Sequence, residues 1–245
     1  MKKMIWQVEW QNIEFSTLGV NLRFFSRASA EFYSAFYAKL FDKYSGYESL
    51  PSSWRDKKFE TAKRVSEFLT EETKVLSVGC GLGYVEKSLI ELEPKCNIDA
   101  YDFSTTSVKW LRAIEGVRVM SELEKDIKYD FAYCTQLIYA LSDKEIANLA
   151  VFLKTVLAEG AMFLTVDTSA DQFENGDTTA VKFCFKQLLK NLILPAYYFF
   201  FKRNQAQFWG WKRSNTEIVK IFIRNGFIVK ETFSAVGQSF IVFRS

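Results

Sequence analysis

Hydrophobic positions follow two different patterns along the chain. In residues 29–44, aromatic and aliphatic side chains recur at the spacing of one helix face, which predicts an amphipathic helix. A second helix is predicted at residues 53–69, where Ser53 can cap the first turn. From residue 74 onward, short runs rich in β-branched residues alternate with helical stretches. The chain therefore changes near residue 74 from helices alone to strands and helices in alternation.

This alternation predicts the fold class. Strands are expected at residues 74–78, 96–101, 117–120, 129–134 and 161–166, and helices at 84–91, 105–114 and 143–157. Such an order is typical of a parallel sheet with helices on both faces. The last two predicted strands, 227–233 and 239–243, are too close together for a parallel crossover. We therefore predict an α/β fold with a doubly wound, mostly parallel seven-stranded sheet that ends in an antiparallel C-terminal hairpin.

Two segments lie outside the alternation. Residues 1–73 are predicted to form an N-terminal helical cap, and residues 74–245 a Rossmann-like domain. Roughly 45 residues separate the fifth predicted strand from the last helix, far more than a plain connection needs. We interpret this stretch, residues 168–213, as a helical lid insert.

Composition narrows the possible functions. The chain has 245 residues, is 49% hydrophobic and 25% charged, and contains no histidine. A histidine base and any metal site that needs imidazole are excluded, and we expect no metal. The longest apolar run, residues 192–201, is too short to span a bilayer, and we expect neither a membrane span nor a signal peptide. The four cysteines show no C-x-x-C pairing, so we expect reduced thiols and a cytoplasmic protein.

A glycine-rich stretch carries the most specific chemical signal. Residues 75–83 read VLSVGCGLG, so that a strand runs into G-x-G-x-G and opens a helix. Glycine allows a sharp turn and a close approach to a ligand, and the helix beyond offers free N–H groups. Asp102 follows the next predicted strand, where a carboxylate can accept both hydroxyls of a ribose. The structural alternatives are an ordinary tight turn at the glycines and an Asx-turn at Asp102.

These motifs resemble those of class I S-adenosylmethionine-dependent methyltransferases. The resemblance rests on VLSVGCGLGYVEKSL (75–89), IDAYDFS (98–104), YDFAYCTQLIYAL (129–141), LAEGAMFLTVDTS (157–169) and the terminal helix and strands. It implies S-adenosyl-L-methionine as the cofactor and methyl transfer as the activity. A dinucleotide-binding dehydrogenase starts similarly, but its G-x-G-x-x-G fingerprint fails because Tyr84 stands where the last glycine is required.

The resemblance also assigns cofactor-binding roles to short segments of the chain. The methionine part of the cofactor would lie against the first of them, formed by Ser77, Gly79, Cys80, Gly81 and Gly83. The ribose would bind Asp102, and the adenine would contact Phe103. The residues bordering the adenine would be Ser121, Glu122 and Leu123, and those facing the sulfonium would be Thr135 and Gln136.

Ser77 departs from the family pattern. The family usually has Asp or Glu at this position, where the acid helps to place the loop and the ammonium group of the cofactor. Serine can still accept a hydrogen bond but supplies no charge. A catalytically silent, cofactor-binding partner subunit is therefore kept as an alternative.

Methyl transfer to a hydroxyl group usually needs a base. Without histidine, that base must be Asp, Glu, Tyr or Lys. Asp167, after the fifth predicted strand, and Tyr139, after the fourth, are the candidate catalytic residues. Each has a structural alternative, as a turn cap or a packing residue. An amine acceptor would need no strong base, so the sequence does not separate O- from N-methylation.

Positive charge is concentrated in the predicted insert. Between Thr178 and Thr216 there is no acidic residue, but there are seven basic ones: Lys182, Lys186, Lys190, Lys202, Arg203, Lys212 and Arg213. The same segment is rich in aromatic residues, which suit sugar stacking or a membrane interface. We therefore predict a small-molecule acceptor, anionic or sugar-like, such as a phosphate-bearing saccharide.

Other interpretations of the basic segment stay open. Residues 181–213 could also contact a membrane surface, or form a helical flap with a solvated lysine face. An RNA methyltransferase is a further alternative, in which this segment would hold phosphates and stack bases. The remainder of the chain is net acidic, with 25 basic and 29 acidic residues, which argues against nucleic acid as a partner.

Overall fold

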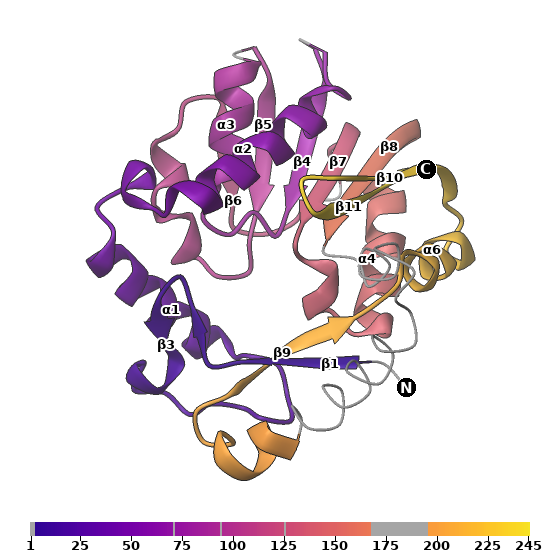
Figure 1. Ribbon diagram of the computed structural model, residues 1–245. Helices are drawn as coiled ribbons and strands as arrows, with labels where there is room; N and C mark the ends of the chain where they lie inside the picture. The colour runs from indigo at the N-terminus through magenta and orange to yellow at the C-terminus, as the bar shows by residue number, and fades with distance from the viewer. Residues whose placement is uncertain (1–2, 71, 94, 125, 168–195) are drawn as a thin grey trace.

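A seven-stranded sheet forms the centre of the protein (Figure 1). The strand order is β10-β11-β8-β7-β4-β5-β6. The parallel strands are β4 (Lys74–Val78), β5 (Asn97–Tyr101), β6 (Val117–Met120), β7 (Tyr129–Thr135) and β8 (Leu157–Asp167). The antiparallel hairpin is formed by β10 (Ile228–Ala235) and β11 (Gln238–Arg244), and β11 pairs with β8. The predicted fold class is confirmed.

This computed structural model describes residues 3–70, 72–93, 95–124, 126–167 and 196–245. The first part of the predicted helical lid insert, with Lys182, Lys186 and Lys190, lies outside the described residues. Within the described part of the chain, no helix combines the length and the apolarity that a bilayer crossing requires.

Helices cover both faces of the sheet. On one face, α2 (Ser52–Ser66) and α3 (Tyr84–Leu92) pack over a core that includes Val75, Leu89 and Phe131. On the other face lie α4 (Asp143–Val156) and α6 (Asn215–Arg224). Each of these last two helices begins with a capping box, Ser142 with Glu145 and Ser214 with Glu217. Because both faces are covered, the central strands β4 and β7 are buried along most of their length rather than at alternate positions.

One predicted helix is wrong. Residues 105–114 form two short 3₁₀ helices, η3 (Ser107–Lys109) and η4 (Leu111–Ala113), instead of an α-helix. The hydroxyl of Ser107 donates a hydrogen bond to the carbonyl of Ser104 at 2.7 Å. Such local side-chain bonds compete with α-helical pairing, which explains why the apolar spacing alone was misleading here.

The N-terminal cap is not purely helical. Its helix α1 (Ala30–Lys43) is preceded by β1 (Lys3–Gln7), by the small pair β2 (Glu9–Trp10) and β3 (Ile13–Glu14), and by η1 (Phe15–Thr17), and is followed by η2 (Tyr47–Ser49). β1 pairs antiparallel with β9 (Gln207–Lys212). The end of the predicted helical insert is therefore a strand, and it belongs to the cap. The division of the chain at residue 73 stays a prediction.

Aromatic side chains hold the cap together. Phe15, Phe32 and Phe36 are fully buried, and Trp209 of β9 stacks on Phe15 with ring centroids 5.5 Å apart. Trp10 stacks on Phe36 at 4.9 Å. Much of the high aromatic content of the chain thus joins the two ends of the sequence in a third core beside the sheet.

Candidate active site

A cavity of about 530 Å³ lies between the carboxyl ends of β4, β5 and β7 and the cap. We call its two sides the sheet wall and the cap wall. The sheet wall is formed by residues 78–85, 101–103, 123 and 135–137. The cap wall is formed by Trp10, Arg27, Ala28, Tyr33, Tyr37, Trp54, Lys58 and Trp209. A crevice at the carboxyl ends of parallel strands is where α/β folds bind ligands.

The glycine loop is the centre of the sheet wall. Gly79 and Gly81 have φ angles of 73° and 57°, in the left-handed region that favours glycine. The N–H of Gly79 donates to the carbonyl of Tyr101 at 2.7 Å, which ties the loop to the end of β5. The loop backbone is therefore held open towards the cavity.

Asp102 connects the loop to the following turn. Its Oδ2 accepts a hydrogen bond from the N–H of Gly81 at 2.9 Å, and its Oδ1 accepts one from the N–H of Ser104 at 2.8 Å. Burial raises the pKa of this carboxyl, and the two amide hydrogen bonds oppose the shift. The Asx-turn alternative is thus present, and the residue also lines the cavity. Each carboxylate oxygen can accept more than one hydrogen bond, so both roles are compatible.

The structure brings most of the predicted cofactor residues to the cavity. The glycine-loop residues, Phe103, Leu123, Thr135 and Gln136 all line it. Ser121 and Glu122 are exposed and do not belong to the lining. The turn after β6 therefore presents one side chain to the cavity, that of Leu123.

Ser77 lies behind the glycine loop, fully buried. Its hydroxyl donates to Oε1 of Glu86 at 2.5 Å, and the hydroxyl of Tyr133 donates to the same oxygen at 2.7 Å. Glu86 comes from the first turn of α3, and burial raises its pKa. The sequence reasoning missed Glu86, although an acid in the helix that follows a glycine loop was visible. A carboxyl group is thus present beside Ser77, supplied by α3 instead of β4.

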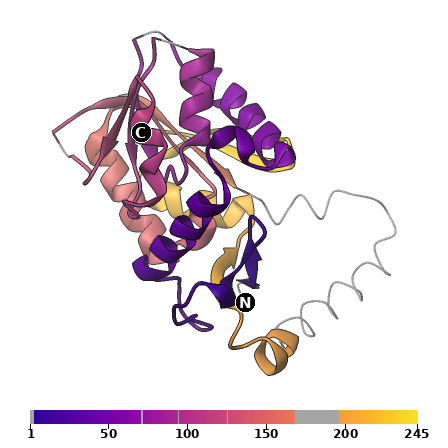
Figure 2. The same ribbon diagram turned by 90° about the vertical axis from the view of Figure 1, so that its left-hand side faces the viewer.

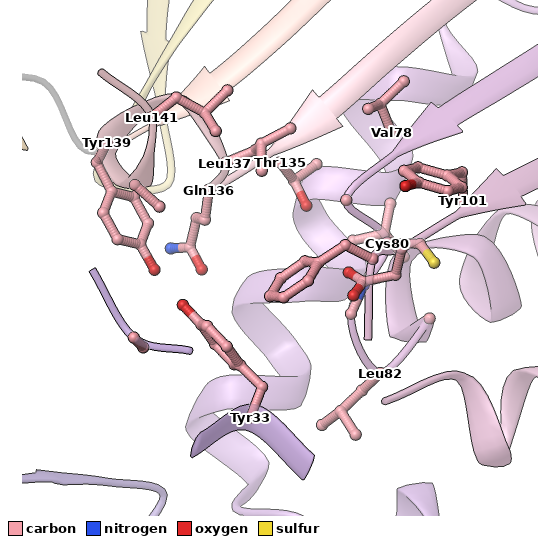
Figure 3. Close-up of a pocket in the computed structure, with 18 of the residues that line it drawn as sticks. Tyr33, Val78, Cys80, Leu82, Tyr101, Thr135, Gln136, Leu137, Tyr139 and Leu141 are labelled. Atoms are coloured by element: carbon pink, nitrogen blue, oxygen red, sulfur yellow. The ribbon is translucent and has the colours of Figure 1, made fainter. Parts of the chain in front are cut away.

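Gln136 has an unusual backbone. Its φ is 54°, a conformation that costs a non-glycine residue roughly 1–2 kcal/mol. Its N–H donates to the carbonyl of Val166 at 2.7 Å. The turn directs the side-chain amide into the cavity (Figure 3), where Oε1 accepts a hydrogen bond from Nζ of Lys58 at 3.1 Å. Backbone strain of this kind is concentrated at functional sites.

Lys58 is a second residue that the sequence reasoning missed. It lies on α2, is 9% exposed, and lines the cavity. The buried residues of α2 are Lys58, Thr61, Ala62 and Val65, so the lysine occupies the inward helix face. Burial lowers its pKa to about 8. A lysine on the apolar face of the predicted helix at 53–69 was the available signal.

Two tyrosines face Gln136. Tyr139, in η5 (Ile138–Ala140), and Tyr33, in α1, point their hydroxyl groups towards the amide of Gln136 (Figure 3). Burial raises the pKa of Tyr33 to about 12 and that of Tyr139 further. Both hydroxyls are therefore protonated at neutral pH and can donate hydrogen bonds to a ligand.

Asp167 lies at the end of β8 and is 6% exposed. It accepts a hydrogen bond from the Thr165 hydroxyl at 3.2 Å and is approached by the backbone N–H groups of Ile138 and Tyr139. Burial raises its pKa to about 7. Its Oδ1 has no hydrogen-bond partner among the described residues. Asp167 is not one of the residues that line the cavity, so it lies behind the Tyr139 segment.

The basic residues of the predicted insert that the structure describes are already engaged. Arg213 is buried, forms an ion pair with Asp143 at 3.0 Å, and donates to the carbonyls of Ile138 and Leu141. Although the segment between Thr178 and Thr216 contains no acidic residue, the fold thus brings Asp143 to Arg213 and neutralises its charge. Lys202 donates to Gln205, and the guanidinium of Arg203 lies 5.5 Å from the ring centroids of Phe25 and Phe199.

The profile of the methyltransferase domain family matches residues 30–229. The chain belongs to this family. The match covers α1, the glycine loop and the five parallel strands, so the predicted class of S-adenosylmethionine-dependent methyltransferases is confirmed. No curated protein sequence matches the chain.

Solved methyltransferase structures share the fold. Human N-acetylserotonin methyltransferase in complex with SAM aligns with a TM-score of 0.58 at 17% identity, over 88% of this chain and 56% of that one. An O-methyltransferase family protein from Burkholderia thailandensis aligns at 0.57 and 12% identity, over 98% and 64%. CalO1, a calicheamicin biosynthesis methyltransferase in its SAH-bound form, aligns with a TM-score of 0.57 at 13% identity, over 88% of this chain and 58% of that one. The chain spans 56–64% of the length of these three structures.

The residues of this chain fit the cofactor of its family. The left-handed glycine loop offers close backbone approach, Asp102 offers a carboxylate at the cavity, and Lys58 offers a buried cation. S-adenosylmethionine supplies an electrophilic methyl group on a sulfonium. Transfer of that group is a direct displacement, for which the protein must provide alignment and charge placement.

Proposed function

We propose that the protein transfers a methyl group from S-adenosylmethionine to a hydroxyl group of a small polar molecule. The observation that carries the proposal is the shared cavity, in which the glycine loop and Asp102 lie opposite the hydroxyl groups of Tyr33 and Tyr139. One compartment can therefore hold both the cofactor and the acceptor. The alignment of two bound reactants is a large contribution that such a site can make.

In this proposal the sheet wall holds the cofactor. The loop residues Gly79, Cys80, Gly81 and Gly83 contact its methionine part, and Asp102 accepts hydrogen bonds from the ribose. Phe103 and Leu123 border the adenine, while Thr135 and Gln136 face the sulfonium. Ser77 acts from behind the loop through its hydrogen bond to Glu86. We assign no contact to Ser121 and Glu122, because their side chains are exposed outside the cavity.

The cap wall would receive the acceptor. Its rings, among them Trp10, Tyr33 and Trp209, suit stacking against a sugar or another flat-faced polar molecule. The hydroxyls of Tyr33 and Tyr139 can hold an acceptor oxygen. A saccharide is therefore the acceptor class we favour, and a phosphate-bearing one remains part of the proposal because Arg27 also lines the cavity.

We assign proton removal from the acceptor to Asp167, acting through a bound water molecule, because its carboxyl group does not line the cavity. Its pKa near 7 suits exchange of a proton at physiological pH, and its unpartnered Oδ1 is available for a hydrogen bond. Tyr139 lies between Asp167 and the cavity, and we assign it the role of positioning the acceptor oxygen. Both assignments depend on the acceptor being a hydroxyl.

A membrane-surface contact through residues 181–213 is supported by exposed aromatic residues in the described part of that segment. Phe200 and Phe201 are 74% and 75% exposed, beside Lys202 and Arg203. The helical residues 196–201 lie at the cap end of the molecule, away from the sheet (Figures 1 and 2). An acceptor linked to a lipid could place its polar part in the cavity while this aromatic surface contacts the membrane that holds the lipid. We also propose a cytoplasmic location, on the sequence grounds given above.

Calorimetric titration with S-adenosylmethionine and S-adenosylhomocysteine tests the first half of the proposal. We expect micromolar binding of both. Isotope transfer from labelled S-adenosylmethionine to a panel of saccharides, sugar phosphates and simple amines tests the second half. Binding with no transfer to any acceptor would favour the silent partner subunit, and salt-sensitive retention of RNA would favour the nucleic-acid alternative. Absence of cofactor binding would overturn the proposal.

A further inference from the structure

Lys58 presents a buried ammonium group to the cavity. Three N–H donors are available at Nζ, and among the described residues Gln136 is the one that accepts a hydrogen bond from it. We propose that Lys58 binds the carboxylate of the methionine part of S-adenosylmethionine. The inference rests on the proposed function, and it assigns an anchoring residue on α2, outside the glycine loop.

The surroundings of Lys58 leave its charge incompletely compensated. Glu86 and Asp167 act on it as negative charges and Lys57 as a positive one, and Trp54 lies with its ring centroid 5.8 Å from Nζ. Within the described part of the chain, Lys58 forms no ion pair. Burying an unpaired charge is costly, and a buried lysine that lines a cavity gains most from an anionic ligand.

The position of Lys58 in the cavity indicates which anionic group of the ligand it binds. Its neighbours Glu86 and Gln136 belong to the start of α3 and the end of β7, on either side of the glycine loop. Gln136 follows β7 and Asp102 follows β5, and these two strands lie on opposite sides of β4, which separates the lysine from the ribose end of the site. The methionine part must lie at the glycine loop if Asp102 holds the ribose. Its carboxylate is then the anion that comes closest to Nζ.

The backbone at Gln136 supports a built site. The left-handed turn at this residue is what aims its amide at Lys58, and it is held by the hydrogen bond to Val166. The amide oxygen fixes one donor of Nζ and leaves the other two for the ligand. A residue with extended backbone at position 136 would not place its side chain beside Nζ of Lys58. The strained turn and the buried lysine therefore form one binding site.

A comparison of two ligands tests this role. S-adenosylhomocysteine carries the amino-acid carboxylate, whereas 5′-methylthioadenosine has the same nucleoside and a sulfur but no amino acid. We expect Lys58→Met to weaken S-adenosylhomocysteine binding roughly 10- to 100-fold, because a hydrogen bond between charged groups is lost. The same variant should bind methylthioadenosine within about twofold of the wild type. Lys57→Met, the neighbouring lysine on the outer part of α2, is the matched control and should change neither affinity.

The outcomes separate the inference from the proposed function. If the wild type binds neither ligand, the proposed function fails. If the wild type binds both and Lys58→Met weakens both equally, the lysine only maintains the cavity and the inference is wrong. No loss in either affinity would also overturn it. Should Lys58→Met be unfolded by circular dichroism, Lys58→Gln provides the same comparison with a polar side chain.

The pH dependence gives an independent readout. A lysine with a lowered pKa is charged below that pKa and neutral above it, so the anchoring should be present below about pH 8 and be lost as the pH rises through it. The α-amino group of the ligand titrates in the same range. The wild-type affinity for S-adenosylhomocysteine should therefore fall more between pH 7 and pH 9 than that of Lys58→Met. Parallel profiles for the two proteins would contradict the inference.

Discussion

The two walls of the cavity are built on different principles. The sheet wall consists largely of backbone: a glycine loop in left-handed conformations, tied to β5 and to the carboxylate of Asp102. The cap wall consists of side chains, mostly aromatic rings, brought together from opposite ends of the sequence by the pairing of β1 with β9. The first arrangement is set within some thirty residues of chain, roughly the length of one βαβ unit. The second requires contacts across about 200 residues, which short motifs do not encode.

This difference explains the division of labour that we propose. A backbone cradle of fixed geometry suits a ligand that is common to the whole family. A wall of side chains can be changed residue by residue, so it suits an acceptor that differs between relatives. The following predictions test whether the two walls can be damaged separately.

The largest expected effect is on the sheet wall. Asp102→Ala should weaken S-adenosylhomocysteine binding roughly 10- to 100-fold, since it removes charged hydrogen-bond acceptors from the ribose site and frees the Gly81 N–H. Titration calorimetry measures this change. Glu122→Ala is the matched control, because this acid follows the next strand but its side chain is exposed away from the cavity. Equal losses in both variants would mean that net charge, and not the site, determines affinity.

The next effect is on the cap wall. A Cβ added at Gly210 in β9 would lie 2.9 Å from the carbonyl carbon of Tyr139 and closer still to its oxygen. Gly210→Ala should therefore destabilise the protein by about 1–3 kcal/mol, as overpacked sites do. Thermal melting should show a lowered Tm. Gly46→Ala, where nothing lies within 4 Å, should melt close to the wild type. An unchanged Tm in Gly210→Ala would show that β9 can move away from η5.

The same contrast explains what the sequence could predict. The parallel strands, the terminal hairpin and the glycine loop follow from local patterns, and the structure confirms the fold they predict. Lys58 could not be assigned, because its importance depends on α2 lying across the carboxyl end of β7. The strand at 207–212 was missed because its partner, β1, is at the other end of the chain. The helix predicted at 105–114 is wrong for the opposite reason, since a local hydrogen bond of the Ser107 side chain competes with α-helical pairing there.

A smaller effect is expected from the tyrosine hydroxyl between the two walls. Tyr139→Phe removes a hydroxyl that faces Gln136 but keeps the ring that stacks near Trp209. A neutral hydrogen bond contributes about 0.5–1.5 kcal/mol, so kcat/KM for the acceptor should fall about 2- to 13-fold with cofactor affinity unchanged. Tyr44→Phe, whose hydroxyl bonds to the Gln11 carbonyl, is the control. If Tyr139→Phe instead loses cofactor affinity, Tyr139 contacts the cofactor and not the acceptor.

The smallest effect on the two walls should come from the exposed aromatic residues outside the cavity. Phe200 and Phe201 are largely exposed, so a Phe200→Ser, Phe201→Ser double variant should change stability by no more than about 0.5 kcal/mol. Cofactor affinity should also be unchanged, since neither residue lines the cavity. Co-sedimentation with vesicles is the sensitive measurement, because aromatic rings beside Lys202 and Arg203 suit the headgroup region of an anionic bilayer. If the wild type and the double variant sediment alike with anionic vesicles, residues 196–203 make no membrane contact. Among the described residues, the cap wall is then the one surface that we assign to the acceptor.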